Sequence, residues 1–363
     1  MIDMRPVLIM AGGTGGHVFP ALAVADELRL RGIPVVWLGT RVGIESRLVP
    51  QAGYPIEWMS VTGLRGKSAI TLLLAPLRLS MACWQAFMVM IKRKPCAVLG
   101  MGGFASGPGG LVAWLMRKPL IVHEQNAIPG LTNKILAKLA TVVLQAFPGV
   151  FKKASTTGNP VRQTICDIAK PEDRVARRVD NGSERLRLLI IGGSLGAVKL
   201  NEMIPQALAK INSEQRPQVR HQTGLKNIES AKNNYATVAV EANVEAFIDD
   251  MPAAYEWADL VICRSGAMTV FELAAAGVAS VLVPYPHAVD DHQTYNAHYL
   301  EHAGAAIIKQ QPELTVEWLA ETIDQFSSDR NKLLEMAVAA RKLAIPGSAK
   351  TIADVCLTAG GIA

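Results

Sequence analysis

The stretch Leu260-Val-Ile-Cys-Arg-Ser-Gly-Ala-Met-Thr-Val-Phe-Glu-Leu-Ala-Ala-Ala-Gly277 decides the fold of this chain. Its first four residues form an apolar run, which Arg264-Ser-Gly266 interrupts. The residues from Thr269 onward are rich in the alanine and leucine that favour a helix, and Gly277 follows at the position of a helix C-cap. The pattern predicts a buried strand, a tight turn and a helix, which is the repeating unit of a parallel sheet covered by helices.

The start of this helix is a candidate anion site. A strand that enters a helix through Ser265-Gly266 leaves the first N–H groups of the helix unpaired at the carboxyl edge of the sheet. Glu272 lies about one turn into the helix, where its carboxylate can accept hydrogen bonds from a sugar diol. Together these features predict a cradle for a ribose and a diphosphate. A purely structural explanation stays open: Ser265 caps the helix and Glu272 favours its positive end, which is worth about 0.3 to 1 kcal/mol.

Length and composition predict two domains and an anionic partner. The 363 residues exceed one ordinary domain, and half of them are apolar. The five cysteines are scattered and lack metal-ligand spacing, which favours a reducing cytoplasm and argues against a structural zinc site. The N-terminus lacks the layout of a signal peptide. A net charge of +6 suits nucleic acid, a phosphorylated substrate or an acidic lipid surface.

Short apolar runs alternate with helical patterns along the chain, as in parallel sheets wrapped by helices. The expected strands are residues 7–10, 35–38, 56–60, 97–100, 120–123 and 141–145 in the first half, and 186–191, 219–222, 238–240, 260–263 and 280–284 in the second. The charged stretch 167–187 is expected to be a surface connection. Residues 349–357 are expected to form a helix that packs back on the first domain.

Three glycine-rich turns follow expected strands: Met10-Ala-Gly-Gly-Thr-Gly-Gly-His17, Gly100-Met-Gly-Gly-Phe-Ala-Ser-Gly-Pro-Gly-Gly110 and Ile191-Gly-Gly-Ser-Leu-Gly196. Glycines let backbone N–H groups approach phosphates, although a tight strand-to-helix turn explains any one of them. The first turn lacks the third glycine of the dinucleotide fingerprint, so no nicotinamide cofactor is expected. His123-Glu-Gln-Asn126 places four polar side chains at the end of another strand, which is the functional edge of an open sheet.

Within the segment 65–94, residues 69–91 form a very apolar run, but polar residues and a proline interrupt it, which excludes a spanning helix. Cations flank it on both sides: Arg65 and Lys67 before it, and Lys92, Arg93 and Lys94 after it. An apolar surface ringed by cations is a candidate for contact with an anionic membrane. A buried helix of the first domain is the alternative.

Seven motifs occur in the order found in one protein family: Met10-Ala-Gly-Gly-Thr-Gly-Gly-His-Val-Phe-Pro20, Gly100-Met-Gly-Gly-Phe104, His123-Glu-Gln-Asn126, Gly158-Asn-Pro-Val-Arg162, Gly192-Gly-Ser-Leu-Gly-Ala197, Cys263-Arg-Ser-Gly-Ala-Met-Thr-Val-Phe-Glu272 and His292-Gln-Thr-Tyr-Asn-Ala297. On these motifs the chain resembles, over nearly its whole length, the MurG family of bacterial glycosyltransferases. That family transfers N-acetylglucosamine from UDP-N-acetylglucosamine to undecaprenyl-pyrophosphoryl-N-acetylmuramoyl-pentapeptide, which converts lipid I to lipid II in peptidoglycan synthesis.

The resemblance implies an α/β GT-B fold, with two Rossmann-like parallel-sheet domains facing a cleft that holds the active site. Residues 1–162 with 345–363 would form the acceptor and membrane-facing domain, and residues 163–344 the donor domain. The protein would be peripheral on the cytoplasmic face of the inner membrane. No Asp-x-Asp occurs, so no metal is expected on the diphosphate, and no aromatic-interleaved basic cluster points to nucleic acid.

Carried over by position, the family's contacts with UDP-N-acetylglucosamine are Thr14, Gly15, Gly16, Asn126, Arg162, Ser194, Ile248, Ala267, Met268, Thr269, Val270, Phe271, Glu272 and Gln293. In this set Ile248 would offer backbone atoms to uracil, and Gln293 would reach the sugar hydroxyls. Gly102, Gly103 and Phe104 are expected to contact the acceptor. Phe271 departs from the family pattern, because some relatives have a small polar residue there.

The implied reaction is a displacement at the anomeric carbon by the acceptor's 4-hydroxyl, with inversion and with UDP as the leaving group. His17 is the expected base, because an unperturbed imidazole pKa of about 6.5 suits neutral pH, and Glu124 is the second candidate. His17 binding the acceptor diphosphate or capping its helix stays open. Arg162, Ser194 and the helix start at Ser265-Gly266 would stabilise the leaving diphosphate.

Two other functions remain as alternatives. A UDP-N-acetylglucosamine 2-epimerase shares the fold and the donor but needs no lipid, and the apolar basic segment 65–94 favours the transferase. A non-catalytic module that binds a nucleotide sugar or nucleic acid is prompted by the sequence pI near 9.1. Release of free UDP without any acceptor would distinguish the epimerase from the transferase.

Overall fold

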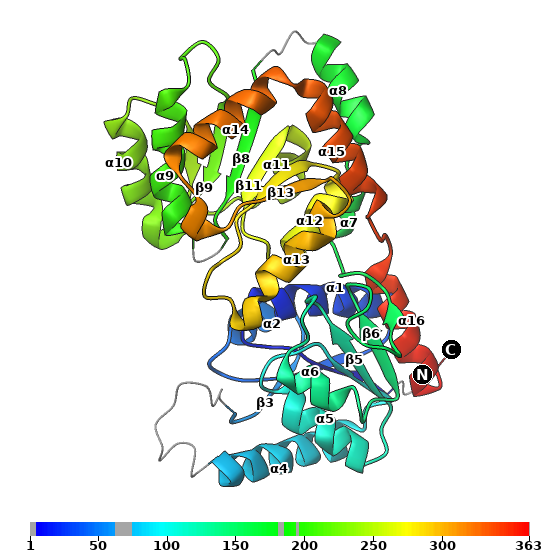
Figure 1. The fold of residues 1–363 in the computed structure, drawn as a ribbon. Helices are drawn as coiled ribbons and strands as arrows, with labels where there is room; N and C mark the ends of the chain where they lie inside the picture. Colours follow the sequence, from blue (N-terminus) through cyan, green and yellow to red (C-terminus); the bar gives the residue numbers. More distant parts are fainter. Residues whose placement is uncertain (1–4, 62–74, 181–184, 194–195, 363) are drawn as a thin grey trace. The chain divides into compact units, whose positions relative to one another are not determined.

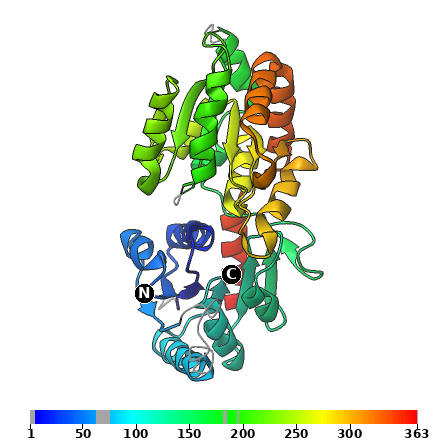
Figure 2. The ribbon, with the colours of Figure 1, turned by 60° about the vertical axis from the view of Figure 1, so that its left-hand side comes forward.

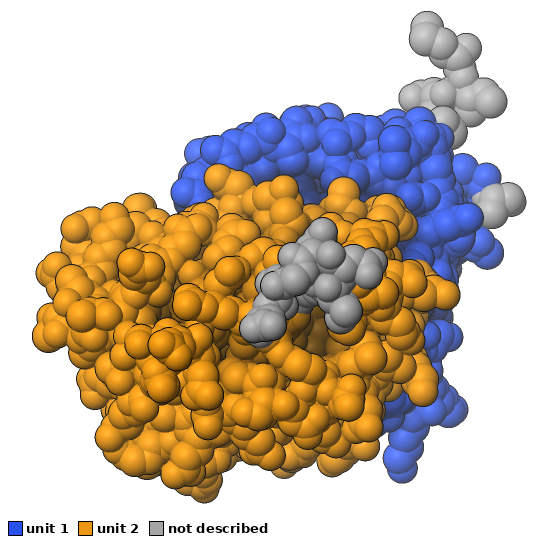
Figure 3. All heavy atoms as spheres, turned by 90° about the horizontal axis from the view of Figure 1, so that it is seen from above, with its two compact units in different colours: residues 1–161, 347–363 blue, residues 162–346 orange. Residues whose placement is uncertain are grey.

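The computed structural model describes residues 5–61, 75–180, 185–193 and 196–362. The chain forms two compact units, one of residues 1–161 with 347–363 and one of residues 162–346 (Figure 3). From the sequence, we expected the chain to pass from the first domain to the second after residue 162 and to return before residue 345. Within the described ranges, none of the helices combines the length and hydropathy that a membrane-spanning segment needs.

Unit 1 is built on a sheet of seven parallel strands, counted over the described residues. In order across the sheet they are β3 (Ile56–Trp58), β2 (Val35–Gly39), β1 (Val7–Met10), β4 (Ala97–Gly100), β5 (Leu120–Glu124), β6 (Val142–Gln145) and β7 (Ser155–Thr156). β1 and β4 are neighbours, with Met10 opposite Gly100. The two glycine turns that follow these strands therefore leave the sheet at the same edge.

Helices cover both faces of the unit 1 sheet (Figure 1). They are α1 (Gly15–Leu30), α2 (Glu45–Gln51), α4 (Ala75–Arg93), α5 (Ser106–Leu115), α6 (Leu131–Leu136) and α16 (Ser348–Gly360). Successive strand residues point to opposite faces, so Val7 and Ile9 pack with α1 and α16, whereas Leu8 and Met10 pack with α4 and α5. The C-terminal helix α16 thus belongs to unit 1, where it contacts α1 and β4.

Unit 2 has a sheet of six parallel strands within the part of the chain that is described. In order they are β10 (Asn243–Glu245), β9 (Gln218–Gln222), β8 (Arg187–Ile191), β11 (Leu260–Cys263), β12 (Ala279–Leu282) and β13 (Ala306–Ile308). The stretch at 260–277 supplies β11 in the interior of this sheet. Both of its neighbours pair with it in parallel, which explains why the strand is apolar at every position.

The α-helices of unit 2 form two groups that cover this sheet (Figure 2). One group is α9 (Val198–Lys210) with α10 (Ile228–Thr237) and α14 (Val316–Ser328). The other is α12 (Ala267–Ala276) with its contacts α7 (Gln163–Cys166), α11 (Met251–Trp257), α13 (His292–Glu301) and α15 (Arg330–Lys342), together with α8 (Pro171–Asp180) on α15. The expected helix after β11 is therefore present, and Gly277 ends it in the left-handed conformation at φ 63°.

Two expectations from the sequence are wrong. Residues 238–240 are not a strand: Ala239 has φ 51°, and Val240 donates its N–H to the Tyr235 carbonyl, which is the geometry of a helix C-cap after α10. The stretch 167–187 is not only a surface connection, because Pro171–Asp180 forms α8. A proline in the first turn followed by two acidic residues is a helix-start signal that the overall charge of the stretch obscured.

Candidate functional site

The turn between β11 and α12 lies at the carboxyl edge of the unit 2 sheet. Gly266 precedes the helix and has no side chain with which to cap it. The Ser265 side chain is fully buried, and among the described residues its Oγ has no hydrogen-bond partner. Asn296 of α13 holds the turn by donating its Nδ2 to the Ser265 carbonyl at 3.3 Å. A buried hydroxyl beside the first N–H groups of a helix makes the turn suitable for binding an anion.

The carboxylate of Glu272 is held in place by two neighbours. The Tyr255 hydroxyl of α11 donates to Oε2 at 3.1 Å, and Arg162 Nη2 lies 3.8 Å from Oε1. Burial raises the pKa of Glu272, while Arg162 and the Tyr255 hydrogen bond oppose that rise. A carboxylate oriented in this way can accept hydrogen bonds from a diol with little further loss of side-chain freedom.

Only part of the run from Ala267 to Glu272 can line a ligand with side chains. Val270 is fully buried, and Phe271 is 2% exposed because its ring stacks on Tyr299 with centroids 5.3 Å apart. The helical period of 3.6 residues therefore turns the side chains of Val270 and Phe271 towards the core, and their expected contact with the donor stays a prediction. Met268, Thr269 and Glu272 are partly exposed, and Ala267 is buried at the helix start, where its backbone N–H belongs to the first turn.

Three other predicted donor contacts belong to unit 2. Gln293 lies in the first turn of α13, and its Oε1 accepts a hydrogen bond from the Tyr285 N–H at 2.9 Å, which orients the amide NH₂ group to act as a donor. Ile248 is 1% exposed, so its side chain is packed inside the unit, and its expected backbone contact with uracil stays a prediction. The Arg162 side chain is half exposed. Ser194 lies outside the described residues.

In unit 1, the turn after β1 places Thr14 and His17 at the start of α1. Thr14 is the N-cap residue, and Gly15 and Gly16 form the first two positions of the helix. The His17 Nδ1 lies 3.2 Å from the Gly12 carbonyl oxygen. The Thr14 hydroxyl oxygen lies 3.4 Å from the same Nδ1. In the tautomer that carries its proton on Nδ1, this nitrogen donates to the Gly12 carbonyl. The neutral ring then has Nε2 as its basic nitrogen.

The glycine turn after β4 packs directly against the turn after β1. Gly102 and Gly103 have φ values of 90° and 87°, which favour glycine. A Cβ on Gly103 would lie 2.4 Å from the Gly12 carbonyl oxygen, and one on Gly102 would lie 2.7 Å from the His17 ring. The structure thus brings His17 together with two predicted acceptor contacts, because β1 and β4 are adjacent. Phe104, from the same turn, is 53% exposed.

Glu124 organises the loop after β5. Its carboxylate is 1% exposed, and Oε1 accepts hydrogen bonds from the backbone N–H and the side-chain amide of Asn126. Oε2 accepts from the Gly130 N–H at 3.2 Å and from Asn133 Nδ2 at 2.9 Å. Both oxygens are committed to this loop, which argues against Glu124 as the catalytic base. Its role is to position Asn126.

Glu45, which the sequence did not single out, plays the same role for the first glycine turn. Its carboxylate is fully buried and accepts from the Gly13 N–H at 2.9 Å, and from the Thr40 N–H at 3.0 Å and hydroxyl at 2.6 Å. A Cβ on Gly12 or Gly43 would lie within 2.6 Å of its oxygens. Glu45 therefore connects the turns after β1 and β2, a contact between distant residues that no local pattern indicates.

Replacing Glu45 with glutamine is expected to lower the free energy of unfolding by about 1 to 3 kcal/mol. The new NH₂ group would face buried donors, and at least one of them would lose its acceptor. Urea denaturation measures the change. The control is Glu202→Gln at an exposed position on α9, which should stay within about 0.5 kcal/mol of the wild type. Equal effects of the two substitutions would contradict the role given to Glu45.

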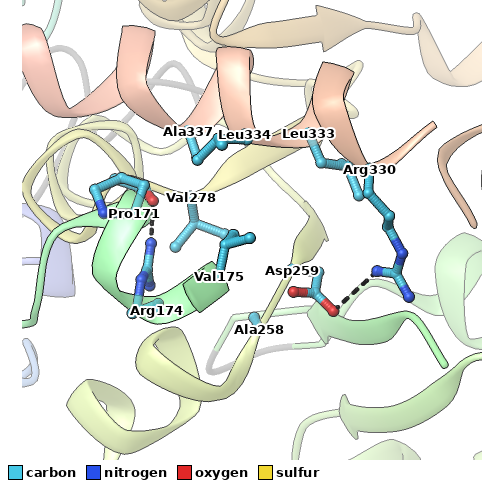
Figure 4. Close-up of a pocket in the computed structure, with 11 residues that line it drawn as sticks. Pro171, Arg174, Val175, Ala258, Asp259, Val278, Arg330, Leu333, Leu334 and Ala337 are labelled. Carbon is cyan, nitrogen blue, oxygen red and sulfur yellow. Dashed lines mark hydrogen bonds and ion pairs between the residues drawn. The ribbon is translucent and has the colours of Figure 1, made fainter. Parts of the chain in front are cut away.

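A cavity of about 130 Å³ lies elsewhere in unit 2, lined by residues of α8 and α15 and by those just before β11 and β12 (Figure 4). Arg174 is 7% exposed there and donates to the carbonyls of Tyr255 and Gly277, and Asp259 pairs with Arg330 at 3.2 Å. The cavity is at the amino ends of these strands and is smaller than the roughly 300–1,000 Å³ of ligand pockets. It is therefore not a candidate for a nucleotide sugar.

Comparison with known proteins connects these features to one family. The glycosyltransferase family 28 N-terminal domain matches residues 7–145, and the family 28 C-terminal domain matches residues 187–352. The UDP-N-acetylglucosamine–N-acetylmuramyl-(pentapeptide) pyrophosphoryl-undecaprenol N-acetylglucosamine transferase of Marinobacter nauticus is 52% identical over 358 residues, 98% of each chain. The protein of the same name from Nitrosococcus oceani is 53% identical over 354 residues, 97% of this chain and 98% of its own.

A solved structure of the same family is also similar to this chain. The crystal structure of Acinetobacter baumannii MurG is similar with a TM-score of 0.85 and 42% sequence identity, over 98% of this chain and 99% of that one. Together with the two parallel sheets, this similarity confirms the predicted GT-B fold class.

Proposed function

The chain belongs to glycosyltransferase family 28 and, within it, to the MurG proteins, and from that premise we propose how its residues carry out the transfer. The enzyme moves N-acetylglucosamine from UDP-N-acetylglucosamine to undecaprenyl-pyrophosphoryl-N-acetylmuramyl-pentapeptide, the step from lipid I to lipid II in peptidoglycan synthesis. It is a hexosyltransferase, and the alternatives of an epimerase and of a non-catalytic module are set aside.

In the proposed donor complex, the diphosphate of UDP-N-acetylglucosamine lies at the start of α12. The observation that carries this proposal is the buried Ser265 hydroxyl, which has no partner among the described residues and lies directly before the first turn of the helix. Arg162 supplies a guanidinium that matches phosphate oxygens. Glu272, oriented by Tyr255, accepts hydrogen bonds from the ribose hydroxyls. Backbone atoms of Ile248 form hydrogen bonds with the uracil, and the Gln293 amide forms hydrogen bonds with the hydroxyls of N-acetylglucosamine.

In the proposed reaction, the 4-hydroxyl of the acceptor attacks the anomeric carbon as the bond to UDP breaks, with inversion. His17 Nε2 takes the hydroxyl proton, and the Nδ1–H bond to the Gly12 carbonyl holds the ring in the required tautomer. The leaving diphosphate gains negative charge, which Arg162 and the α12 helix start stabilise because their dipoles are already oriented. Gly102, Gly103 and Phe104 bind the acceptor next to His17.

The decisive experiment is transfer of radiolabel from several UDP-sugars to a lipid-pyrophosphate muramoyl-pentapeptide. Label from UDP-N-acetylglucosamine is expected in the lipid product with a β-linkage, at a rate far above that from UDP-glucose. Release of UDP at the same rate without acceptor would contradict the transferase mechanism and favour the epimerase. A product with an α-linkage would contradict inversion.

For the membrane, we propose that α4 docks on the cytoplasmic face of an anionic bilayer. Leu77, Met81, Trp84, Met88 and Ile91 recur at intervals of four and three residues, which places them along one stripe of the helix. Each of these side chains is at least 46% exposed, although all are large and apolar. Such a stripe on a helix of unit 1 fits an interfacial position, with its apolar side chains below the headgroups.

The cations around α4 contribute less charge than the sequence suggested. Lys92 Nζ and Arg93 Nη2 lie 2.9 Å and 2.7 Å from the same Glu57 oxygen, so this carboxylate offsets part of their charge. Arg65 and Lys67 lie outside the described residues. We therefore attribute most of the proposed membrane affinity to the apolar stripe and a smaller part to salt-sensitive attraction.

The double change of Trp84 and Met88 to serine is expected to weaken binding to phosphatidylglycerol-containing vesicles at least about tenfold. Full burial of each large apolar side chain is worth roughly 1.5 to 3 kcal/mol, and 1.4 kcal/mol corresponds to a factor of ten. Vesicle sedimentation measures the partition coefficient. Leu225→Ser is the matched control, because Leu225 is 78% exposed and belongs to unit 2, whereas α4 belongs to unit 1. Unchanged sedimentation of the double variant would refute the docking surface.

A further inference from the structure

The last turn of α13 carries two histidines and a glutamate that the transfer reaction does not use. His298, Glu301 and His302 are spaced i, i+3 and i+4, so they share one face of the helix. The His298 Nδ1 and the Glu301 Oε2 are 2.7 Å apart. The rings of His298 and His302 are nearly parallel, at 12°, with centroids 5.1 Å apart. Three groups with metal-binding atoms therefore converge at one point on the surface of unit 2.

The distances suit a single ion. One ligand atom from each of the three side chains lies within 4.8 Å of the other two. Ligands of a tetrahedral Zn²⁺ with bonds of about 2.0–2.1 Å are roughly 3.3 Å apart, so small side-chain rotations close the remaining gap. His298 and Glu301 are each about two-fifths exposed, which leaves room for those rotations.

The helix beneath the three groups is fixed by packing. Between the ligands, Leu300 is fully buried, and Tyr299 stacks on Phe271 and donates its hydroxyl to the Leu343 carbonyl at 3.0 Å. The ligands also lie at the C-terminal end of α13, where the helix dipole favours a positive charge. A backbone held in place and a negative helix end both lower the cost of bringing the ligands together around a cation.

From this geometry we propose that His298, Glu301 and His302 form a Zn²⁺ site that holds the last turn of α13. Two imidazoles and one carboxylate select Zn²⁺ and similar transition metals over Mg²⁺ and Ca²⁺, which prefer oxygen ligands. Three protein ligands leave the fourth position of the ion for water. The expectation of no metal rested on cysteine spacing and on the absence of Asp-x-Asp, and neither pattern detects a site made of histidines and a glutamate.

The test is equilibrium dialysis of the full chain against Zn²⁺ at neutral pH, after removal of metal with a chelator. The wild type and His287→Ala are expected to bind one equivalent more than the double variant His298→Ala, His302→Ala. His287 is an exposed histidine outside the cluster, so it controls for the loss of an imidazole. Taking the difference between variants cancels any Zn²⁺ held by the partly exposed thiols of Cys83 and Cys166.

Thermal unfolding gives a second measurement. Zn²⁺ should raise the Tm of the wild type and of His287→Ala, because an ion that binds only the folded state stabilises it, and should leave that of the double variant unchanged. The substituted side chains are on the surface, and unchanged circular dichroism spectra would show that the variants fold. Equal Zn²⁺ uptake by the wild type and the double variant would overturn the proposal, as would Glu301→Gln binding Zn²⁺ as tightly as the wild type.

Discussion

Replacing His17 with alanine is expected to lower the turnover number roughly 100-fold or more, while the dissociation constant for UDP stays near that of the wild type. General-base catalysis contributes about 10²–10⁴ to a rate, and His17 is the proposed base. UDP affinity should persist because the diphosphate and ribose contacts are assigned to unit 2. Steady-state transfer kinetics and calorimetric titration with UDP measure the two quantities.

His17→Asn separates the base from a binding role. Its amide can still donate to the Gly12 carbonyl but cannot accept the hydroxyl proton, so it should be as slow as the alanine variant. His287→Ala, at an exposed position outside the proposed active site, should retain full activity. If His17 instead bound the acceptor diphosphate, the acceptor KM would rise with little change in turnover. Near-native turnover of His17→Asn would remove His17 from the role of base.

Replacing Glu272 with alanine is expected to weaken UDP binding about 10- to 100-fold. Hydrogen bonds to a charged group are worth about 1.5–3 kcal/mol, and each 1.4 kcal/mol is a factor of ten in the dissociation constant. The effect should be large because Tyr255 and Arg162 hold this carboxylate in one orientation, ready for the ribose. Calorimetric titration with UDP and with uracil, which lacks the ribose, would show how much of the loss depends on the ribose.

Two further variants test whether the loss comes from the ribose contact or from local disorder. Tyr255→Phe removes the hydroxyl that orients Glu272 but keeps the carboxylate, so it should weaken UDP binding less than Glu272→Ala does. Glu272→Gln keeps the shape of the side chain and one acceptor oxygen, and should fall between the two. An unchanged dissociation constant for Glu272→Ala would contradict the ribose assignment. An equal loss in uracil binding would point instead to a disordered α12.

Much of the proposed site follows from features that are local in the sequence. The strand, turn and helix at 260–277 are encoded by an apolar run, a serine-glycine turn and a helical segment with a glycine C-cap, and the structure has all three. The turns at Gly13 and Gly102 could be recognised in the same way, because positive φ angles favour glycine whatever surrounds them. Alternation of strands and helices was enough to place β1 and β4 in one parallel sheet.

Errors occurred where burial or long-range contact decides the structure. The apolar residues 238–240 cap a helix, because Val240 packs back on α10 instead of pairing with a strand. The charged stretch 167–187 contains α8. Its Arg174 is buried and donates hydrogen bonds to the backbone carbonyls of two residues that are distant in the sequence. The sequence also gave no sign that the Phe271 side chain stacks on Tyr299 and turns inward.

The amino-acid sequence by itself determined the two parallel sheets, the glycine turns at their carboxyl edges and the membership in a glycosyltransferase family. The sheets and turns depend on periodicity and backbone conformation, which act over a few residues, whereas the family was indicated by the resemblance of seven short motifs. Only the tertiary structure showed which side chains hold these candidates in place: Tyr255 and Arg162 beside Glu272, Glu45 on the first turn, and Glu124 on the loop of Asn126. Their partners lie far apart in the chain, and a buried carboxylate acquires its role from the donors that folding places around it.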